Sequence, residues 1–257
     1  MRTLCEHPAW NDGCRLVCTP NGASVAKADT DGIALSRPGP VIDVYDPAEL
    51  SAAAPARLRR GLEPCGPVAR LRTPDLWEAV ATAIIRQVIR ADQARLMYQR
   101  FTGTYGKPVE DGRIFPPTEV VLSLGDGAFA ELGMAFKRDP LRAAAQAVLD
   151  CGEKWAQSSP LELVDELQSI PRIGPWTAGA AVADATGDFS IYPYGDMAVR
   201  KYARQAFPDL ELPDQEAAFA ARWSSYSATP SELSVLTALT LALGGDRAQP
   251  LDQNEPS

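Results

Sequence analysis

Apolar residues recur at the spacing of one helix face in the first half of the chain. The positions are Leu76, Val80, Ala83, Ile84, Ala91, Ala94, Tyr98 and Phe101. Thr73 is a residue type favoured at helix N-caps, and Pro74 follows it at the first helical position that this cap would define. The pattern predicts helical structure that begins directly after Thr73.

Two later helices are predicted from their N-terminal residues. Ser159 with Glu162, and Thr229 with Glu232, have the spacing of a capping box, and a proline stands at the first helical position in each case. After the second box, leucines recur at helical spacing until the glycine pair at residues 244–245. Glycine is typical of a helix end, so we expect the last helix to stop there.

The N-terminal part of the chain has a different pattern. In residues 1–66, Pro and Gly are scattered among short extended pieces such as PVIDVY at 40–45, which favour strands. We therefore expect a small β-rich or irregular region at residues 1–66, a helical domain at residues 67–245, and a disordered polar tail at residues 246–257. The expected fold class is mainly α.

One apolar run is interrupted by turn-forming residues. The stretch IPRIGPWTAGAAV at residues 170–182 holds Pro171, Gly174 and Pro175 ahead of small residues suited to a helix. Proline fixes its own φ and glycine adopts dihedrals that other residues avoid, so the pattern predicts a tight turn. A helix over residues 176–185 follows, and the free N–H groups at its start form an anion-binding site.

Length and composition indicate a globular protein without a membrane partner. The chain has 257 residues, 46% of them hydrophobic, which is enough for a full core in one large domain or two small ones. It has no run of roughly 18 apolar residues, and its first residues lack the apolar core of a signal peptide. We expect a cytoplasmic location. Five cysteines in a chain of this size favour reduced thiols.

The charge distribution is uneven. A formal net charge of −8 argues mildly against a nucleic-acid partner, because phosphate binding draws on Lys and Arg. Only the local field at a binding face decides this, however, and the positive residues gather in two segments. They are Arg86, Arg90, Arg95 and Arg100 in one, and Arg200, Lys201 and Arg204 in the other. By themselves these clusters are typical of solvated helix faces.

Candidate catalytic groups are few. His7 is the one histidine, which disfavours histidine-centred triads and multi-histidine metal sites. Cys5, His7, Cys14 and Cys18 are zinc-ligand types, but their spacing matches none of the usual paired-cysteine patterns. The sequence has neither a Walker A nor a Rossmann glycine pattern. Catalysis would therefore use carboxylates, lysines or the substrate itself.

One carboxylate stands out by its context. In FSIYPYGDMAVRKYARQAF, residues 189–207, an aromatic, strand-like piece ends in Pro193 and Gly195, and Asp196 then opens a basic amphipathic helix. Aspartate is a favoured N-cap, and Asp196 with Arg200 would form an ordinary i,i+4 pair worth about 0.3–0.5 kcal/mol. Considered alone, Asp196 is interpreted as a helix cap.

The hairpin and the aspartate occur together in a known order. LQSIPRIGPWTA at residues 167–178 is similar to L-x-x-[LF]-P-G-[IV]-G-x-W-T-A, and Asp196 lies 22 residues after Gly174. Residues 77–106 and 115–148 are similar to the helices that precede such a hairpin. This order resembles the helix-hairpin-helix DNA glycosylase superfamily, and within it the alkylbase (3-methyladenine) glycosylase branch. The similarity covers residues 67–243 and implies two helical subdomains with a cleft between them.

The resemblance implies a set of contacts with double-stranded DNA that contains a damaged base. Three backbone carbonyls would hold a structural monovalent cation, Na⁺ or K⁺, and the N–H groups after them would grip one phosphate. The carbonyls belong to Gln168, Ile170 and Ile173. The residues implied in DNA binding are Arg172, Gly174, Trp176, Thr177, Gln87, Val88 and Arg200. Backbone amides read no base sequence, which suits a repair enzyme that works anywhere.

Two of these positions carry alternatives. Val88 matches the family's wedge residue, which would fill the gap left by a flipped nucleotide, whereas the other interpretation is a core valine on a helix. Arg172 stands where the first hairpin glycine is expected, and it either strains the turn or adds a phosphate contact. The family's usual pattern G-Q-[QL]-V-S is replaced here by RQVIR at residues 86–90, which lacks the small residues expected where DNA approaches.

The resemblance assigns the chemistry to Asp196. Its carboxylate beside C1′ would stabilise an oxocarbenium ion and orient or deprotonate the attacking water. Trp176 stands where bifunctional relatives carry a Schiff-base lysine, which implies base release without strand cleavage. Trp176 would either stack on a cationic base or pack under the hairpin. Met197 stands where the branch often carries an aromatic pocket residue. No four-cysteine cluster follows the domain, so neither an iron–sulfur cluster nor another catalytic cofactor is expected.

Three functions remain open at this point. The leading one is a monomeric, monofunctional DNA glycosylase that removes alkylated or otherwise damaged bases in base excision repair. The second is a catalytically idle or regulatory DNA-binding relative, which the acidic balance favours. The third is an N-glycosidase that acts on a small nucleoside, which would explain a negatively charged protein without an extended basic groove.

Overall fold

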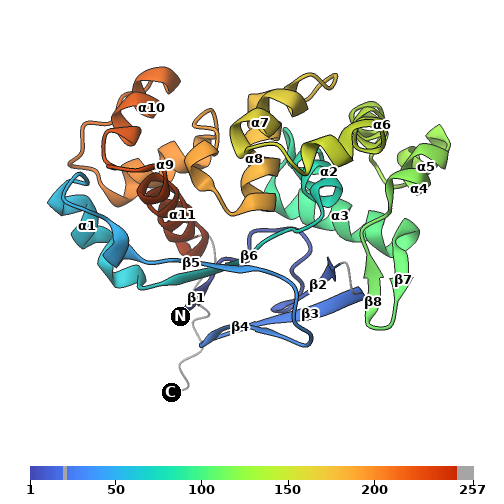
Figure 1. Ribbon diagram of the computed structural model, residues 1–257, viewed down its shortest axis with the longest axis horizontal. Coiled ribbons are helices and arrows are strands. Elements are labelled where there is room, and N and C mark those ends of the chain that lie inside the picture. Colours follow the sequence, from blue (N-terminus) through green and yellow to red (C-terminus); the bar gives the residue numbers. More distant parts are fainter. Residues whose placement is uncertain (20–21, 248–257) are drawn as a thin grey trace, which may run out of the picture.

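The chain folds into a helical body that lies against small β-sheets. A computed structural model describes residues 1–19 and 22–247. Figure 1 shows most of the helices on one side of the view and the strands of the N-terminal part below them. The mainly α fold class, with two helical subdomains after a β-rich N-terminal region, is confirmed.

The strands form two three-stranded sheets and one hairpin. In the first sheet, β6 lies between β1, to which it is parallel, and β5, to which it is antiparallel. The second sheet is the antiparallel meander β2-β3-β4, and β7 with β8 forms the hairpin. The bounds are β1 Arg2–Thr3, β2 Cys14–Thr19, β3 Gly22–Asp29, β4 Gly32–Leu35, β5 Ile42–Tyr45, β6 Val68–Leu71, β7 Lys107–Val109 and β8 Gly112–Ile114.

The central strand β6 corrects the predicted boundary at residue 66. All four of its residues are buried, because it pairs on both edges and is covered by the helical body. The N-terminal β-rich region therefore reaches Leu71, and Val68–Leu71 belong to a sheet rather than to the helical domain.

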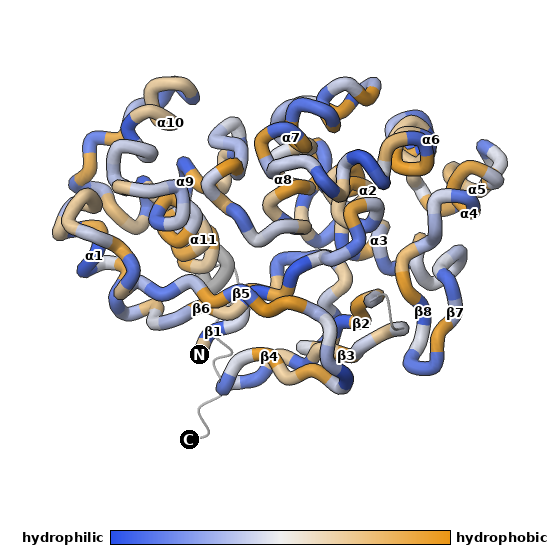
Figure 2. The backbone as a smooth tube through the Cα atoms, in the orientation of Figure 1, coloured by the Kyte–Doolittle hydropathy of each residue, from blue (hydrophilic) through white to orange (hydrophobic). Residues whose placement is uncertain are grey.

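Eleven α-helices lie in the described ranges. They are α1 Ala56–Leu62, α2 Leu76–Arg86, α3 Ala91–Tyr105, α4 Thr118–Ser123, α5 Asp126–Glu131, α6 Arg138–Trp155, α7 Pro160–Gln168, α8 Pro175–Thr186, α9 Met197–Ala206, α10 Glu216–Ser224 and α11 Pro230–Arg247. Helix α8 packs on α2 and α7, while α11 packs on α9 and on a short 3₁₀ helix at Phe189–Ile191. Apolar positions, orange in Figure 2, are frequent along α8 and α11.

The predicted helix starts are confirmed in two cases and wrong in one. Ser159 and Glu162 form the capping box of α7. Thr229 caps α11 by accepting the N–H of Glu232 at 3.2 Å. Helix α2 begins later than predicted, because the Asp75 side chain caps it by accepting the N–H of Trp77 at 2.9 Å. Thr73 is buried instead, where its hydroxyl accepts a hydrogen bond from Arg15.

Two other local predictions are corrected. The aromatic piece before Asp196 is the 3₁₀ helix rather than a strand, because the Asp188 side chain accepts the N–H of Ser190 and turns the backbone. Helix α11 continues past Gly244 to Arg247. Gly244 serves packing rather than helix termination, since a β-carbon there would collide with the ring of Tyr202. Of the predicted disordered tail, residues 246–247 lie in α11 and residues 248–257 lie outside the described residues.

None of the helices in the described ranges is both long and apolar enough to cross a membrane.

Candidate active site

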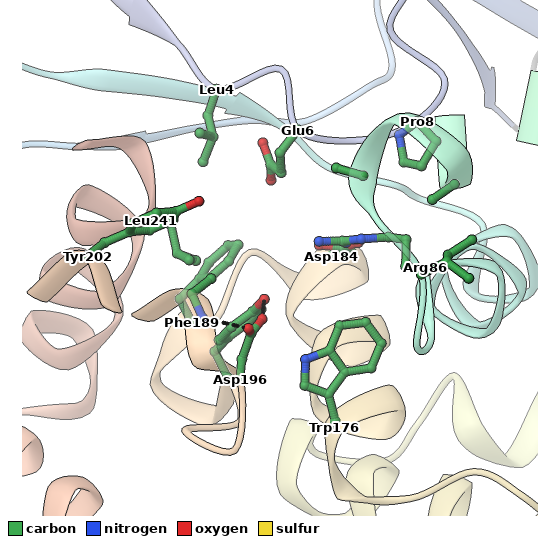
Figure 3. Close-up of a pocket in the computed structure, with 15 residues that line it drawn as sticks. Leu4, Glu6, Pro8, Arg86, Trp176, Asp184, Phe189, Asp196, Tyr202 and Leu241 are labelled. Carbon is green, nitrogen blue, oxygen red and sulfur yellow. Dashed lines mark hydrogen bonds and ion pairs between the residues drawn. The ribbon is translucent and has the colours of Figure 1, made fainter. Parts of the chain in front are cut away.

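A cavity of about 340 Å³ lies between the two helical subdomains. Its walls come from the end of α2, the start of α8, the loop before α9, and the N-terminal segment (Figure 3). This volume falls in the usual range for small-molecule sites. Polar lining residues include Glu6, Arg86, Asp184, Asp196 and Tyr202.

Asp196 is both a helix cap and a cavity residue. Its Oδ1 accepts the N–H of Ala198 at 2.8 Å, which caps α9. Its Oδ2 accepts the hydroxyl of Tyr192 at 2.5 Å, and Figure 3 shows the carboxylate directed into the cavity. The capping interpretation and the catalytic interpretation thus describe the same side chain. The predicted pair with Arg200 does not form, because Arg200 donates to the Asp214 carbonyl oxygen instead.

Tyr192 is a site residue that the sequence interpretation missed. Its ring is buried, and burial, followed by the nearby Asp196 charge, raises the pKa of its hydroxyl well above the usual value. The hydroxyl therefore remains protonated and acts as a donor to Asp196. The available signal was an aromatic residue four positions before the aspartate, in a segment interpreted as a strand.

Trp176 forms another wall of the cavity. It lies in the first turn of α8 and is half-buried, so it is not packed under the hairpin. The guanidinium carbon of Arg86 lies 5.9 Å from the centroid of the Trp176 ring. The indole therefore presents an aromatic surface on which a planar group can stack.

A buried ion network forms the floor of the cavity. Asp184 accepts Arg70 Nη2 at 2.5 Å and Arg86 Nη1 at 3.4 Å, and Arg70 Nε also donates to Glu6 at 2.7 Å. These residues come from segments far apart in the sequence. Arg86 was interpreted as part of a solvated helix face, but its side chain is only 20% exposed. Its neighbour Arg90 is the solvated one, since it is paired with Asp92 at the surface.

The predicted tight turn is present, but Arg172 rather than Gly174 has the left-handed backbone conformation. Gly174 is the N-cap of α8 with φ −92° and ψ 178°, which any residue adopts. The left-handed position belongs to Arg172, with φ 68°. This confirms the strained-turn alternative for Arg172, whose side chain reaches Asp139 at 3.5 Å. A β-carbon on Gly174 would meet no atom within 4 Å, so this position is open toward solvent.

The start of α8 is free to bind an anion. No side chain caps it, Pro175 has no N–H, and the N–H groups of Trp176 and Thr177 fall in the first turn, where intrahelical acceptors are lacking. The Thr177 side chain is buried, and its hydroxyl accepts Gln87 Nε2 at 2.6 Å. Gln87 also donates to the Arg172 carbonyl oxygen at 3.3 Å. Gln87 thus ties the end of α2 to the hairpin.

Val88 is neither in the core nor on a helix. It follows the C-cap of α2, its side chain is fully exposed, and its φ is 57°. A left-handed backbone is rare for a β-branched residue and costs roughly 1–3 kcal/mol. The buried Lys137 supports this turn, because its Nζ donates to the carbonyl oxygens of Ile84 and Gln87 at 2.7 Å each. The core-valine alternative is wrong.

Two predicted site residues lie elsewhere. Met197 is 70% exposed and does not line the cavity, because the first turn of α9 directs it to solvent. The prediction that Met197 lines a base pocket is therefore corrected. Arg200, one turn further on, has its guanidinium at 3.7 Å from the Met197 sulfur and at 3.0 Å from the Asp214 carbonyl.

The sequence offered two sets of candidate metal ligands, the backbone carbonyls of the hairpin and the N-terminal cysteines with His7. Gln168 ends α7, and Ile170 and Ile173 anchor the turn with buried side chains. The Ile170 carbonyl accepts the N–H of Ile173 at 3.0 Å, which occupies one of its two lone pairs. The zinc candidates Cys5, His7, Cys14 and Cys18 do not form a metal-binding group in the part of the chain that the structure describes.

Comparison with known proteins provides an independent test. No model of a protein family matches the chain. The chain is 28% identical over 164 residues to the "Probable bifunctional transcriptional activator/DNA repair enzyme AlkA" of Mycobacterium tuberculosis, a match that covers 59% of this chain and 31% of the relative. It is 24% identical over 192 residues to the "DNA-3-methyladenine glycosylase" of Bacillus subtilis, covering 67% of this chain and 59% of the relative. The chain thus matches less than two thirds of the length of either relative.

Solved structures share the fold over nearly the whole chain. The 3-methyladenine DNA-glycosylase from Archaeoglobus fulgidus superposes with a TM-score of 0.70 at 22% identity, covering 93% of this chain and 91% of that one. This chain has the fold of the helix-hairpin-helix DNA glycosylases. A second solved structure, the 3-methyladenine DNA glycosylase Mag1 of Schizosaccharomyces pombe in complex with abasic DNA, matches a smaller part: 65% of this chain and 80% of its own at a TM-score of 0.54 and 19% identity.

The shared fold agrees with the arrangement of the site. Helix α7, the turn and α8 form the hairpin, and the loop before α9 carries the aspartate. The cavity lies between these two parts. The resemblance to helix-hairpin-helix DNA glycosylases that the sequence indicates is confirmed by the named relatives and by the shared fold.

Proposed function

We propose that this protein is a monofunctional DNA glycosylase that hydrolyses the N-glycosidic bond of alkylated or otherwise damaged bases. The observation that carries the proposal is the Asp196 carboxylate, which is directed into a cavity beside the Trp176 ring and fixed there by Tyr192. The names of the relatives from Mycobacterium tuberculosis and Bacillus subtilis support the same activity and the alkylated substrate class.

Duplex DNA is the proposed partner. The uncapped start of α8 offers N–H groups to one phosphate, and the open side of Gly174 lets the phosphate approach closely. A monovalent cation held by the carbonyls of Gln168, Ile170 and Ile173 would add positive charge beside that phosphate. The Ile170 carbonyl has a lone pair left for this purpose.

Val88 is the proposed wedge. It stands between Arg86 and Ile89, which both line the cavity, and it is the exposed apolar tip of a turn held by Lys137. An apolar side chain at this place can enter the base stack and fill the gap left when the damaged nucleotide turns into the cavity. A strained residue kept in this conformation by its surroundings favours a functional role.

The proposed chemistry uses the charge of Asp196. Cleavage breaks the bond between C1′ and the base nitrogen, and the electron pair leaves with the base. The carboxylate stabilises the positive charge that develops on the sugar, and it orients the water whose oxygen then bonds to C1′. The hydroxyl of Tyr192 and the N–H of Ala198 hold the carboxylate in place. With Trp176 in place of a lysine, the reaction ends at an abasic strand.

The geometry of the cavity favours a DNA glycosylase over the two alternative functions, an idle DNA-binding protein and a nucleoside hydrolase. A catalytically idle DNA-binding protein has no need of a carboxylate fixed inside a cavity. A nucleoside hydrolase has no need of a fully exposed valine at the cavity rim or of an uncapped helix start. The exposed Val88 therefore favours a duplex substrate over a nucleoside.

Base release from methylated duplex DNA tests the proposal. We expect free methylated base and a strand that stays intact until alkali is added. A borohydride-trapped protein–DNA adduct would contradict the monofunctional mechanism. Tight binding to duplex DNA with an abasic-site analogue, without release of any damaged base, would favour the idle DNA-binding alternative.

A further inference from the structure

Arg86 brings a positive charge into the proposed base cavity. It is the last residue of α2, and its side chain enters the cavity above the Trp176 ring instead of extending to solvent (Figure 3). A base stacked on Trp176 would therefore lie beside the guanidinium. Among the described residues, Asp184 is the one acceptor of its side-chain hydrogen bonds, and it takes Nη1 at 3.4 Å. The Nε and Nη2 donors remain available to a ligand.

The ion network holds this guanidinium in place, and Arg86 is the more weakly paired of its two arginines. Asp184 is shared, since Arg70 binds it at the shorter distance of 2.5 Å. Arg70 is also paired with Glu6. The two arginines and two carboxylates balance in charge, and Arg86 is the arginine of the pair with the longer contact and the greater exposure.

Asp196 reaches the same cavity from a different element. It comes from the loop before α9, whereas Arg86 comes from α2, and the two residues share no hydrogen bond in the described structure. Of the charged residues that line the cavity, Glu6 and Asp184 are paired with Arg70. Asp196 faces the position proposed for the sugar, and Arg86 lies beside the aromatic wall proposed for the base.

A guanidinium beside the base affects the departure of a neutral base but not that of a cationic one. A base alkylated at a ring nitrogen carries a positive charge and leaves as a neutral molecule, so a nearby cation does not help its departure. A neutral base leaves with the electron pair of the broken bond and becomes an anion. A fixed cation that donates to that anion lowers the barrier for the neutral base.

We infer that Arg86 donates to an oxygen or nitrogen acceptor of the bound base and stabilises the negative charge on a neutral leaving base. The inference rests on the proposed glycosylase function and names the residue that acts on neutral damaged bases such as deaminated purines, whose carbonyl oxygens are suitable acceptors. The C1′–N bond breaks toward the base, water adds to C1′, and the base takes its proton from solvent after release.

The test compares a neutral and a cationic lesion in the same duplex. Single-turnover release of hypoxanthine and of 7-methylguanine is measured for the wild-type protein and for Arg86→Gln. The variant keeps polar donors while losing the charge, and Asp184 keeps its partner Arg70, so the ion network does not leave an unpaired carboxylate. Arg60→Gln, on the exposed face of α1, is the matched control for the same loss of charge outside the cavity.

We expect Arg86→Gln to lower hypoxanthine release by about a hundredfold and to change 7-methylguanine release by less than about threefold. Affinity for duplex DNA with an abasic-site analogue should match that of Arg60→Gln. An equal loss on both lesions would overturn the inference, because it would mean that Arg86 only shapes the cavity. Wild-type release of 7-methylguanine alone would overturn the inference and leave the proposed function standing. Release of neither base would overturn both.

Discussion

Tyr192 donates its hydroxyl to Asp196 at 2.5 Å from the 3₁₀ helix immediately before the aspartate. The second carboxylate oxygen of Asp196 accepts a backbone N–H of α9. The carboxylate is thereby held by two donors, one buried and one at the helix start, and its orientation into the cavity does not depend on a bound ligand. Such a fixed charge costs little reorganisation when positive charge develops nearby.

The first prediction concerns the charge of Asp196. Asp196→Asn retains the shape and the helix cap but removes the negative charge, so base release should fall by about a hundredfold or more, equivalent to about 3 kcal/mol. Stability should change little, because Asn caps helices about as well as Asp. Asp196→Ala should additionally lose about 1 kcal/mol of stability. Base-release kinetics and thermal midpoints for both variants check this, and an Asn variant with wild-type release would end the catalytic assignment.

The second prediction concerns the strained wedge. Val88→Gly should raise the free energy of unfolding by about 1 kcal/mol, because glycine adopts a left-handed φ without penalty and the exposed side chain contributes no packing. The same change should reduce excision, since the group that fills the base stack is lost. Val88→Leu keeps the apolar bulk and should retain excision. The idea fails if Val88→Gly releases damaged base as fast as the wild-type protein.

The third prediction concerns the open side of Gly174. A β-carbon meets no protein atom there and the backbone is of the ordinary extended kind, so Gly174→Ala should fold with unchanged stability. If a phosphate approaches this position, Gly174→Ala should weaken binding to duplex DNA and Gly174→Asp should weaken it further by charge repulsion. The loss should be equal for damaged and undamaged duplexes, because a backbone contact reads no sequence. A loss confined to damaged DNA would assign the turn another role.

The fourth prediction concerns pH. Burial, followed by the charges of Arg15, Arg86, Arg70 and Arg95, lowers the pKa of His7 well below its ordinary value of 6.5. The folded protein therefore keeps His7 neutral, while the unfolded chain takes up a proton as the pH falls below that value. Stability should be lost on acidification, by up to about 1.4 kcal/mol for each pH unit below 6.5.

His7→Asn provides the control for this prediction. An Asn oxygen can replace the ring nitrogen Nδ1, which accepts the N–H of Ala9 at 3.1 Å, but it does not titrate. The free energy of unfolding is measured by denaturant at about pH 6.5 and about pH 5.5 for both proteins. Carboxylates contribute equally to both, so the difference reports His7, which is the one histidine in the chain. Identical pH slopes would show that His7 is protonated in the folded state as readily as in the unfolded chain.

The sequence by itself determined the local frame of this protein. Ser159 with Glu162 marked the start of α7, and the prolines on either side of Gly174 marked the turn into α8. The pattern at residues 193–196 marked Asp196 as a helix cap, and the resemblance to the glycosylases, in which an aspartate follows the hairpin at the same distance, marked it as catalytic. These features depend on interactions within a few residues, such as capping bonds and fixed dihedrals, so they are readable from short stretches.

Only the tertiary structure decided which side chains share the cavity. Arg86, Asp184 and Glu6 come from three separate segments, and their pairing depends on how α2, α8 and the N-terminal segment pack. The charge pattern placed Arg86 on a solvated helix face, and the family resemblance placed Met197 in the pocket. Packing reversed both positions. A buried charge is tolerated only where partners from other elements compensate its lost hydration, and the order of residues along the chain does not specify those partners.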